Sequence, residues 1–148
     1  MQRHHLLPRQ LMIQPSFAPL LCAVGGESLG FADFRRNGLL LPANEDAASR
    51  IGLPLHRGPH RGYNAMVAER MGQIEASWSA RRLHSPMNAQ AEAGMRLRLL
   101  QSALRRRLLQ PGLRPIMLNR NDPLGKGVDF TELDAMVDLL WAGTEVQL

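Results

Sequence analysis

Four of the five histidines stand in two tight clusters, and this arrangement constrains the fold more than any other feature of the chain. The first cluster is the pair His4-His5, and the second consists of His56 and His60. Imidazoles that bind one metal ion have to converge to about 2.0–2.1 Å from it. A metal site that draws on both clusters therefore has to bring the N-terminus against a segment that lies far along the sequence.

The second cluster falls where a helix is expected to begin. Gly58 suits the N-cap and Pro59 suits the first helical position. We therefore expect His56 at the end of a strand or loop and His60 in the first helical turn. The unpaired N–H groups at such a helix start also favour a phosphate.

The paired histidines suggest a division of labour. Adjacent side chains in an extended segment point to opposite faces, so His4 and His5 cannot easily serve the same ion. One of them can bind the metal while the other faces the substrate as a general base. An imidazole suits that second task because its usual pKa of about 6.5 lies near working pH.

Each of these patterns also has a purely structural interpretation. A histidine pair near an N-terminus is often a solvated end or the remnant of a tag, and two histidines four residues apart are commonly a surface pair. Asn37-Gly38 is by itself only a turn, and Tyr63 and Met66 are typical of a core. The functional interpretation depends on their order along the chain.

The rest of the pattern predicts a mostly helical protein. Phe17, Leu20, Leu21 and Val24 have helical spacing, with Ser16 as the expected N-cap and Gly25-Gly26 as the stop. Leu39-Leu40-Leu41-Pro42 follows a turn signal and predicts a short buried strand, with Leu6-Leu7 as the end of another. Residues 43–52 are expected to form a polar loop that could hold one helical turn.

Two long helices are expected after the histidines, over about residues 59–82 and 88–109, followed by a loop over 113–128. A last helix is expected from Asp129, with Glu132 at capping-box spacing, to Trp141. The apolar stripes of these helices are, in order, Tyr63, Met66, Val67, Met71, Ile74 and Trp78; Met95, Leu99, Leu100, Ala103, Leu104 and Leu108; and Leu133, Met136, Val137, Leu140 and Trp141.

The charge of the chain favours a polyanionic partner. All 18 basic residues precede Asp129, whereas five of the 13 acidic residues lie from Asp129 onward, so residues 1–128 carry a net charge of +10. Lys126 is the only lysine, and arginine offers a planar fork of donors that matches phosphate. We expect electrostatic, largely non-specific binding of nucleic acid, although solubility or a GC-rich genome would also explain such a composition.

Cys22 is the only cysteine, which excludes a disulfide framework and favours a reducing, cytoplasmic site of action. No apolar stretch is long enough to cross a membrane, so no membrane partner is expected. A signal peptide ending near Cys22 would discard His4 and His5 on cleavage, and we reject it for that reason.

Three segments, in order, resemble the AHH family of HNH nucleases. They are His4-His5-Leu6-Leu7-Pro8, Asn37-Gly38-Leu39-Leu40-Leu41-Pro42, and Leu53-Pro54-Leu55-His56-Arg57-Gly58-Pro59-His60-Arg61-Gly62-Tyr63-Asn64. The resemblance covers about residues 3–80. Arg3 stands where the alanine that gives the family its name would be, a departure that lies outside the chemistry.

The resemblance implies an α+β, mostly helical fold. It consists of a small β-hairpin and a helix that form a ββα-metal, treble-clef-like finger, with additional C-terminal helices. We divide the chain into a nuclease core over residues 1–82 and a helical extension over 83–148, packed together as one compact unit.

The resemblance also implies roles for individual residues. His4, His56 and His60 would be the metal ligands, His5 the general base, and Asn37 the brace of the loop that orients His5. Tyr63 and Asn64 would support the ligands from behind, and Arg57 or Arg61 would clamp a phosphate oxygen. Three imidazoles favour zinc or nickel, with magnesium as an alternative.

The implied activity is metal-dependent hydrolysis of phosphodiester bonds in DNA or RNA. Many domains that resemble this one are C-terminal modules of bacterial toxins, delivered into a target cell as part of a larger chain and neutralised by an immunity protein. The alternative is a metal-stabilised finger that binds nucleic acid without cutting it. The presence of His5 beside three ligands argues against that alternative, because a structural site needs no further imidazole.

Overall fold

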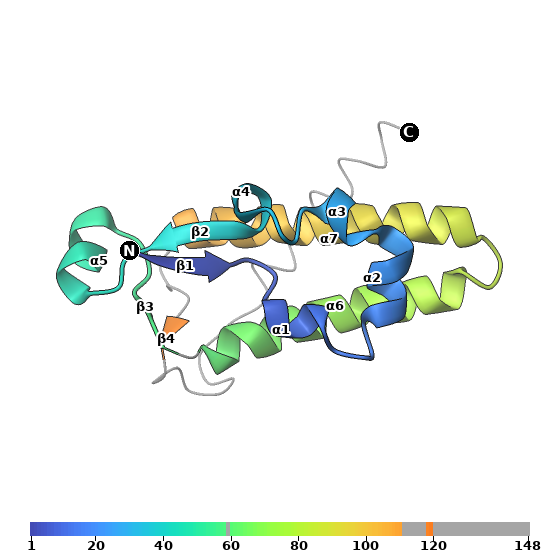
Figure 1. The fold of residues 1–148 in the computed structure, drawn as a ribbon, viewed down its shortest axis with the longest axis horizontal. Coiled ribbons are helices and arrows are strands. Elements are labelled where there is room, and N and C mark those ends of the chain that lie inside the picture. The colour runs from blue at the N-terminus through green and yellow to red at the C-terminus, as the bar shows by residue number, and fades with distance from the viewer. Residues whose placement is uncertain (59, 111–117, 120–148) are drawn as a thin grey trace.

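The computed structural model describes residues 1–58, 60–110 and 118–119 (Figure 1). Two long helices lie side by side and carry the smaller elements on one flank and at one end. The elements in chain order are β1 (Gln2–His5), α1 (Arg9–Met12), α2 (Ala18–Val24), α3 (Gly26–Leu29), α4 (Phe34–Asn37), β2 (Gly38–Leu41), α5 (Glu45–Ile51), β3 (His56–Arg57), α6 (Arg61–Arg81), α7 (Pro86–Leu109) and β4 (Leu118–Asn119).

Helices α6 and α7 form an antiparallel pair joined by a short turn (Figure 1). The core is one cluster to which both helices contribute, together with apolar residues of α1, α2, α3 and β2. The predicted stripe of α6 is confirmed, because all six of its residues are buried. The predicted stripe of α7 is partly wrong: Met95 and Leu99 are only half-buried, whereas Ala93 and Leu97 are buried. The reason is that α2 and α3 also pack on α7, so α7 buries a wider arc than one partner helix would cover.

Strands β1 and β2 pair antiparallel, with Gln2 opposite Leu41 and His5 opposite Gly38. This pair and the following helix α6 confirm the expected α+β arrangement of two strands and a helix. Strand β1 ends at His5, so the buried Leu6 and Leu7 follow the strand rather than ending it. Four short helices separate the two strands along the chain.

The turn into β2 requires a glycine. A Cβ added at Gly38 would overlap both the ring and the carbonyl oxygen of Phe34. This close approach keeps α4 directly against the start of β2, and it places Asn37 at the buried junction between the two elements.

Several predicted boundaries shift in the structure. Helix α2 begins at Ala18 with Phe17 as its N-cap, so Ser16 is not the cap, whereas Gly25 ends the helix as expected with a φ of 83°. Residues 43–52 hold α5, which is longer than a single turn. Its N-cap Asn44 accepts a hydrogen bond from the backbone N–H of Ala47 at 2.8 Å, and this bond offsets an otherwise unpaired donor.

The start of α6 also differs from the prediction. His60, rather than Gly58, is the N-cap, and the helix begins at Arg61. Gly58 has a φ of 76°, a left-handed conformation that glycine adopts readily, and it turns the chain between β3 and α6. Pro59 lies outside the described residues.

Strand β3 pairs in parallel with β4, with His56 opposite Leu118. Strand β4 lies within residues 113–128, which we expected to be a loop. The last predicted helix, Asp129 to Trp141, lies outside the described residues. Within the described ranges, no helix combines the length and the apolar character that a membrane span requires.

Candidate metal centre and active site

His4, His56 and His60 come together although they lie on three different elements. Their ring centroids are 5.1 Å apart in each of the three pairs. Each ring offers one nitrogen, and these nitrogens all lie within 4.8 Å of one another. Small side-chain rotations would bring all three to about 2.0–2.1 Å from one ion.

The elements around the cluster explain this convergence. His4 is in β1, His56 is in β3, and His60 is the N-cap of α6. His4 and His56 are buried with exposed fractions of 1% and 8%, whereas His60 is half-buried. The cluster is therefore closed on the β1 side and more open toward the N-terminus of α6.

Two amide side chains fix how the rings are oriented. His56 Nδ1 lies 3.0 Å from Gln2 Oε1, and His60 Nδ1 lies 3.0 Å from Asn64 Oδ1. Because an amide oxygen only accepts, each Nδ1 donates its proton, and Nε2 of both rings keeps a lone pair. This is the arrangement that metal-bound histidines show, with the second nitrogen held by a hydrogen bond.

The cluster leaves buried nitrogens without partners among the described residues. Neither ring nitrogen of His4 has a hydrogen-bond partner there, and neither does His56 Nε2. A buried polar atom without a partner destabilises a fold, and few proteins keep three of them in one place without a reason. Each neutral ring carries a lone pair on one of its nitrogens, and a bound cation would take up one lone pair from His4 and one from His56, so the residues fit a metal.

Burial also keeps two rings of the cluster neutral, those of His4 and His56. Burial lowers the pKa of His4 to about 3, with a further lowering from the charges of His60, His56 and His5. Burial, followed by His60, lowers the pKa of His56 to about 4. Both rings are thus uncharged at neutral pH, which is the protonation state that a metal ligand needs.

These pKa shifts predict that the metal-free protein loses stability in acid. An unfolded histidine titrates near 6.5, so between about pH 6.5 and 4 the unfolded state binds more protons than the folded state. Stability should therefore fall as the pH drops below about 6.5, by up to about 1.4 kcal/mol per pH unit for each such histidine.

Urea unfolding in the presence of EDTA at pH 7, 6 and 5 measures this loss of stability. These pH values lie above the usual pKa values of carboxyl groups. The variant His84→Gln is the matched control, because His84 is exposed and lies outside the cluster. It should show the same dependence as the parent. A midpoint that stays constant from pH 7 to pH 5 would contradict the prediction.

His5 lies on the opposite face of β1 from the cluster. It is half-exposed, and its ring centroid lies 6.1 Å from that of Phe34, which Arg3 also contacts. Burial lowers the pKa of His5, and the cations Arg9 and Arg3 lower it further. The ring is therefore neutral at neutral pH and within reach of solvent, as a proton acceptor has to be.

Asn37 holds the chain that follows His5. Its amide forms a pair with the backbone of Leu7: Leu7 N–H donates to Oδ1 at 2.9 Å, and Nδ2 donates to the Leu7 carbonyl at 3.0 Å. The Asn37 carbonyl also accepts from Leu6 N–H at 2.9 Å. Asn37 is fully buried, so these bonds are sheltered from water and fix the exit of β1.

The family follows from a comparison of the whole sequence with known families. Residues 1–104 match the model of AHH, a nuclease family of the HNH/ENDO VII superfamily with conserved AHH. The chain belongs to the AHH family. No curated protein and no solved structure matches it.

The departure from the AHH pattern at Arg3 lies away from the histidine cluster. Arg3 is exposed, and its guanidinium carbon lies 5.1 Å from the centre of the Phe34 ring, on the face of β1 that carries His5. Arg3 therefore lies on the face of β1 opposite to the three clustered rings.

The remaining predicted site residues of this AHH chain surround the cluster. Tyr63 is buried with its ring 4.6 Å from that of His4, and its hydroxyl donates to the Leu6 carbonyl at 2.7 Å. Asn64 contacts His60 as described above. Arg57 and Arg61 are exposed and directly follow His56 and His60 in sequence.

Sequence reasoning missed two supporting residues. Gln2 could have been found, because it stands two residues before His4 in an extended segment and so shares its face. Gln101 gave no such signal. It lies on α7, is buried, and donates from Nε2 to Asn37 Oδ1 at 3.3 Å and to the Leu29 carbonyl at 3.1 Å.

Proposed function

We propose that this AHH protein is a metal-dependent endonuclease that hydrolyses phosphodiester bonds of DNA or RNA. The observation that carries the proposal is the cluster of His4, His56 and His60, with buried unpaired nitrogens, next to a half-exposed neutral His5. A set of ligands and a separate proton acceptor are the two parts that metal-assisted hydrolysis needs.

In this proposal, His4, His56 and His60 hold one divalent cation. Three imidazoles favour zinc or nickel, with magnesium as the alternative, because magnesium prefers oxygen ligands. When bound, the cation would stabilise negative charge that develops on the phosphate and on the leaving oxygen. Gln2 and Asn64 would keep the rings of His56 and His60 turned toward it.

The proton transfer falls to His5. An imidazole nitrogen of His5 takes a proton from a water molecule, the water oxygen forms a bond to phosphorus, and the bond between phosphorus and the leaving oxygen breaks. Asn37 is a positioning residue in this scheme, because it fixes the backbone of Leu6 and Leu7 directly after His5.

The substrate phosphate is expected at the N-terminus of α6. The side chain of the N-cap His60 accepts no hydrogen bond from the backbone N–H groups that open this 21-residue helix. The positive end of the helix therefore offers backbone N–H groups to an anion. Arg57 and Arg61 are exposed at the same end, where either could clamp a non-bridging oxygen.

A biological setting follows from the resemblance to toxin modules. We propose that the chain acts in the cytoplasm of a target cell, that it is delivered as part of a larger toxin, and that an immunity protein neutralises it. The exposed, reactive face around His5 is the surface that such an inhibitor would have to cover.

Digestion of supercoiled plasmid DNA and of structured RNA tests the proposal. We expect cleavage with added zinc, nickel or magnesium, and loss of cleavage after extensive dialysis against EDTA. Restoration by one of these metals then identifies the working ion. Nucleic-acid binding without cleavage under any metal would instead favour the non-catalytic finger, and undiminished cleavage in EDTA would exclude metal dependence.

A further inference from the structure

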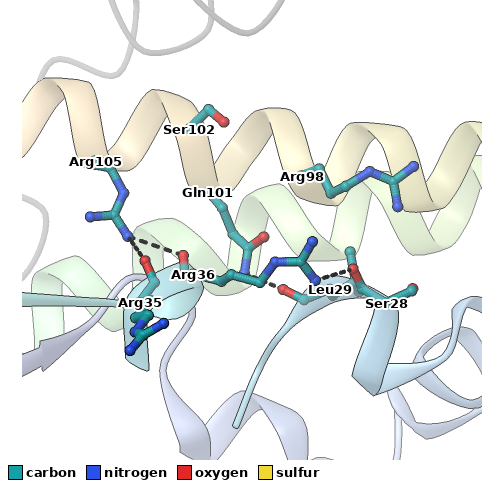
Figure 2. Close-up of a pocket in the computed structure, with 8 residues that line it drawn as sticks. All are labelled: Ser28, Leu29, Arg35, Arg36, Arg98, Gln101, Ser102 and Arg105. Carbon is teal, nitrogen blue, oxygen red and sulfur yellow. Dashed lines mark hydrogen bonds between the residues drawn. The ribbon is translucent and has the colours of Figure 1, made fainter. Parts of the chain in front are cut away.

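A pocket lined by arginines lies away from the histidine cluster, between α7 and the α3–α4 segment (Figure 2). Its volume is about 220 Å³. One water molecule occupies about 30 Å³ in the liquid, so the pocket has room for several of them. We call it the arginine pocket. Its lining residues are Ser28, Leu29, Arg35, Arg36, Arg98, Gln101, Ser102 and Arg105.

Besides Arg35, three arginines line this pocket, and the guanidinium of Arg98 lies beside Gly94, on the side of Arg98 away from Arg105. Figure 2 shows Arg98 and Arg105 extending from α7 and Arg36 extending from the opposite wall, whereas the side chain of Arg35 points away. Arg98, Ser102 and Arg105 are spaced by four and three residues, so they share one face of α7. The helix therefore contributes two arginines and a serine to the lining of the pocket.

Backbone carbonyls hold two of these groups in place. Arg105 Nη2 donates to the carbonyl oxygens of Arg35 at 2.8 Å and Arg36 at 3.2 Å, and Arg36 Nη1 donates to the Ser28 carbonyl at 3.2 Å. Each guanidinium has five N–H donors, so these bonds leave several of them for a ligand. The groups are thus oriented before any ligand binds.

A glycine fixes the course of the Arg36 side chain. Gly30 has a φ of 65°, and a Cβ added there would clash with the Arg36 stem, which crosses directly over it. The stem therefore lies in a shallow backbone channel that a larger residue at position 30 would fill. This packing directs the guanidinium to Ser28 and the pocket.

The positive charge of the pocket is not neutralised within the described part of the chain. Among the described residues, no Asp or Glu lines the pocket, and none of the three guanidinium groups forms an ion pair. By contrast, Arg81 and Arg96 on the same pair of helices both pair with Glu92. Cations that line one pocket without a counter-charge repel one another and favour a bound anion.

We propose that the arginine pocket binds a phosphate group. Phosphate matches the planar fork of arginine, which can donate two parallel hydrogen bonds to it. The phosphate can come from a nucleic-acid strand or from free phosphate in solution. The strand as the source rests on the proposed nuclease function, in which case the pocket anchors the substrate at a distance from the scissile bond.

The pocket also adjoins the brace of the active site. Gln101, which lines it, donates to Asn37 Oδ1, and Asn37 in turn holds the backbone of Leu7. A phosphate in the pocket would therefore lie against the same scaffold that positions His5. A substitution of Gln101 would therefore disturb Asn37 as well as the pocket, whereas substitutions of the arginines leave this contact intact.

The test uses the full-length protein in EDTA, so that neither metal binding nor cleavage contributes. Inorganic phosphate is titrated and followed by NMR of the arginine side chains, and a labelled DNA duplex is titrated and followed by fluorescence anisotropy. We expect Arg36→Gln/Arg98→Gln to weaken phosphate binding about tenfold or more, because charge-assisted hydrogen bonds are lost. Arg98→Gln alone guards against misfolding, since Arg98 forms no hydrogen bond to a described side chain or backbone group.

Arg106→Gln is the matched control, because Arg106 is an exposed arginine of α7 that does not line the pocket. Equal losses in the control and the pocket variants would indicate general surface charge and overturn the proposal. The absence of phosphate-dependent shifts at Arg36, Arg98 and Arg105 in the parent, together with unchanged DNA affinity in the pocket variants, would also overturn it.

The DNA arm identifies the source of the phosphate. If the strand supplies it, the slope of log affinity against log salt should decrease by about 0.9 for each phosphate contact removed. Loss of phosphate binding with unchanged DNA affinity supports the pocket as a site for free phosphate. Because no cleavage is measured, failure of the nuclease proposal leaves these results intact, and failure of the pocket leaves the nuclease proposal standing.

Discussion

His5→Ala is expected to lower the turnover of nucleic-acid cleavage by about a hundredfold to ten-thousandfold, the usual cost of losing a positioned general base. Metal binding and nucleic-acid binding should remain, because His5 lies on the opposite face of β1 from the three clustered rings and is only half-buried. The comparison requires a nuclease assay alongside calorimetric metal titration of the same variant.

The pH profile of the parent provides an independent measurement of the same role. A general base has to be neutral, so activity should decline as the pH falls through the pKa of His5. Burial, Arg9 and Arg3 all lower that pKa below 6.5, so the acid limb of the profile should lie below pH 6.5. This limb should disappear from the residual activity of His5→Ala.

His84→Ala is the matched control, since it also removes one imidazole but from an exposed position outside the cluster. It should leave turnover unchanged. If His5→Ala instead loses the metal while His4→Ala keeps it, the two roles are exchanged. If His5→Ala cleaves as fast as the parent, the proposed mechanism is wrong.

His4→Ala is expected to reduce metal affinity by at least about a hundredfold. Loss of a residue that merely orients a ligand typically costs about tenfold to a hundredfold, and loss of the ligand itself should cost more. The stabilisation that added zinc gives the parent in thermal unfolding should shrink accordingly, because a ligand that binds only the folded state raises its stability.

His4 is almost fully buried and its ring packs against Tyr63, so His4→Ala also leaves a cavity. His60→Ala avoids that effect, because His60 is a half-buried N-cap whose side chain does not cap the helix. Both variants should lose metal affinity, and Gln2→Ala should lose less than either. Parent-like zinc affinity in His60→Ala and His4→Ala would show that the cluster is not the metal site.

The sequence was most informative where the deciding interactions are local. The stripe of α6 could be predicted in full because helical periodicity alone places those residues on one face. Strand β2 followed from a turn signal before a short apolar run. The order of the histidine, asparagine and glycine motifs was sufficient for the AHH family, which the comparison then confirmed.

Boundaries that depend on packing were predicted less well. At the start of α6, Gly58 and Pro59 matched local preferences for a cap and a first turn, yet the chain turns at Gly58 and the helix begins after His60. On α7, periodicity indicated one apolar face, whereas contacts with α2, α3 and α6 bury a broader one. Local propensities do not report how many partners a helix will have.

The candidate site likewise combines features that the sequence shows with features that only the folded structure shows. The sequence by itself determined which residue types were available: four clustered histidines, an asparagine before a strand, and an excess of arginine. Alternation along an extended segment was also enough to separate His4 from His5. Only the tertiary structure decided that His4 meets His56 and His60, that Gln2 orients His56, and that Gln101 reaches Asn37.

The arginine pocket depended entirely on the tertiary structure. Arg36 is separated by more than sixty residues from Arg98 and Arg105, and no motif links them. They line one pocket because α3 packs on α7, because Arg105 binds the carbonyls of Arg35 and Arg36, and because the bare backbone at Gly30 leaves room for the Arg36 stem. Such contacts are set by the shapes of surfaces that form only when the chain has folded, so one-dimensional periodicity and spacing contain no record of them.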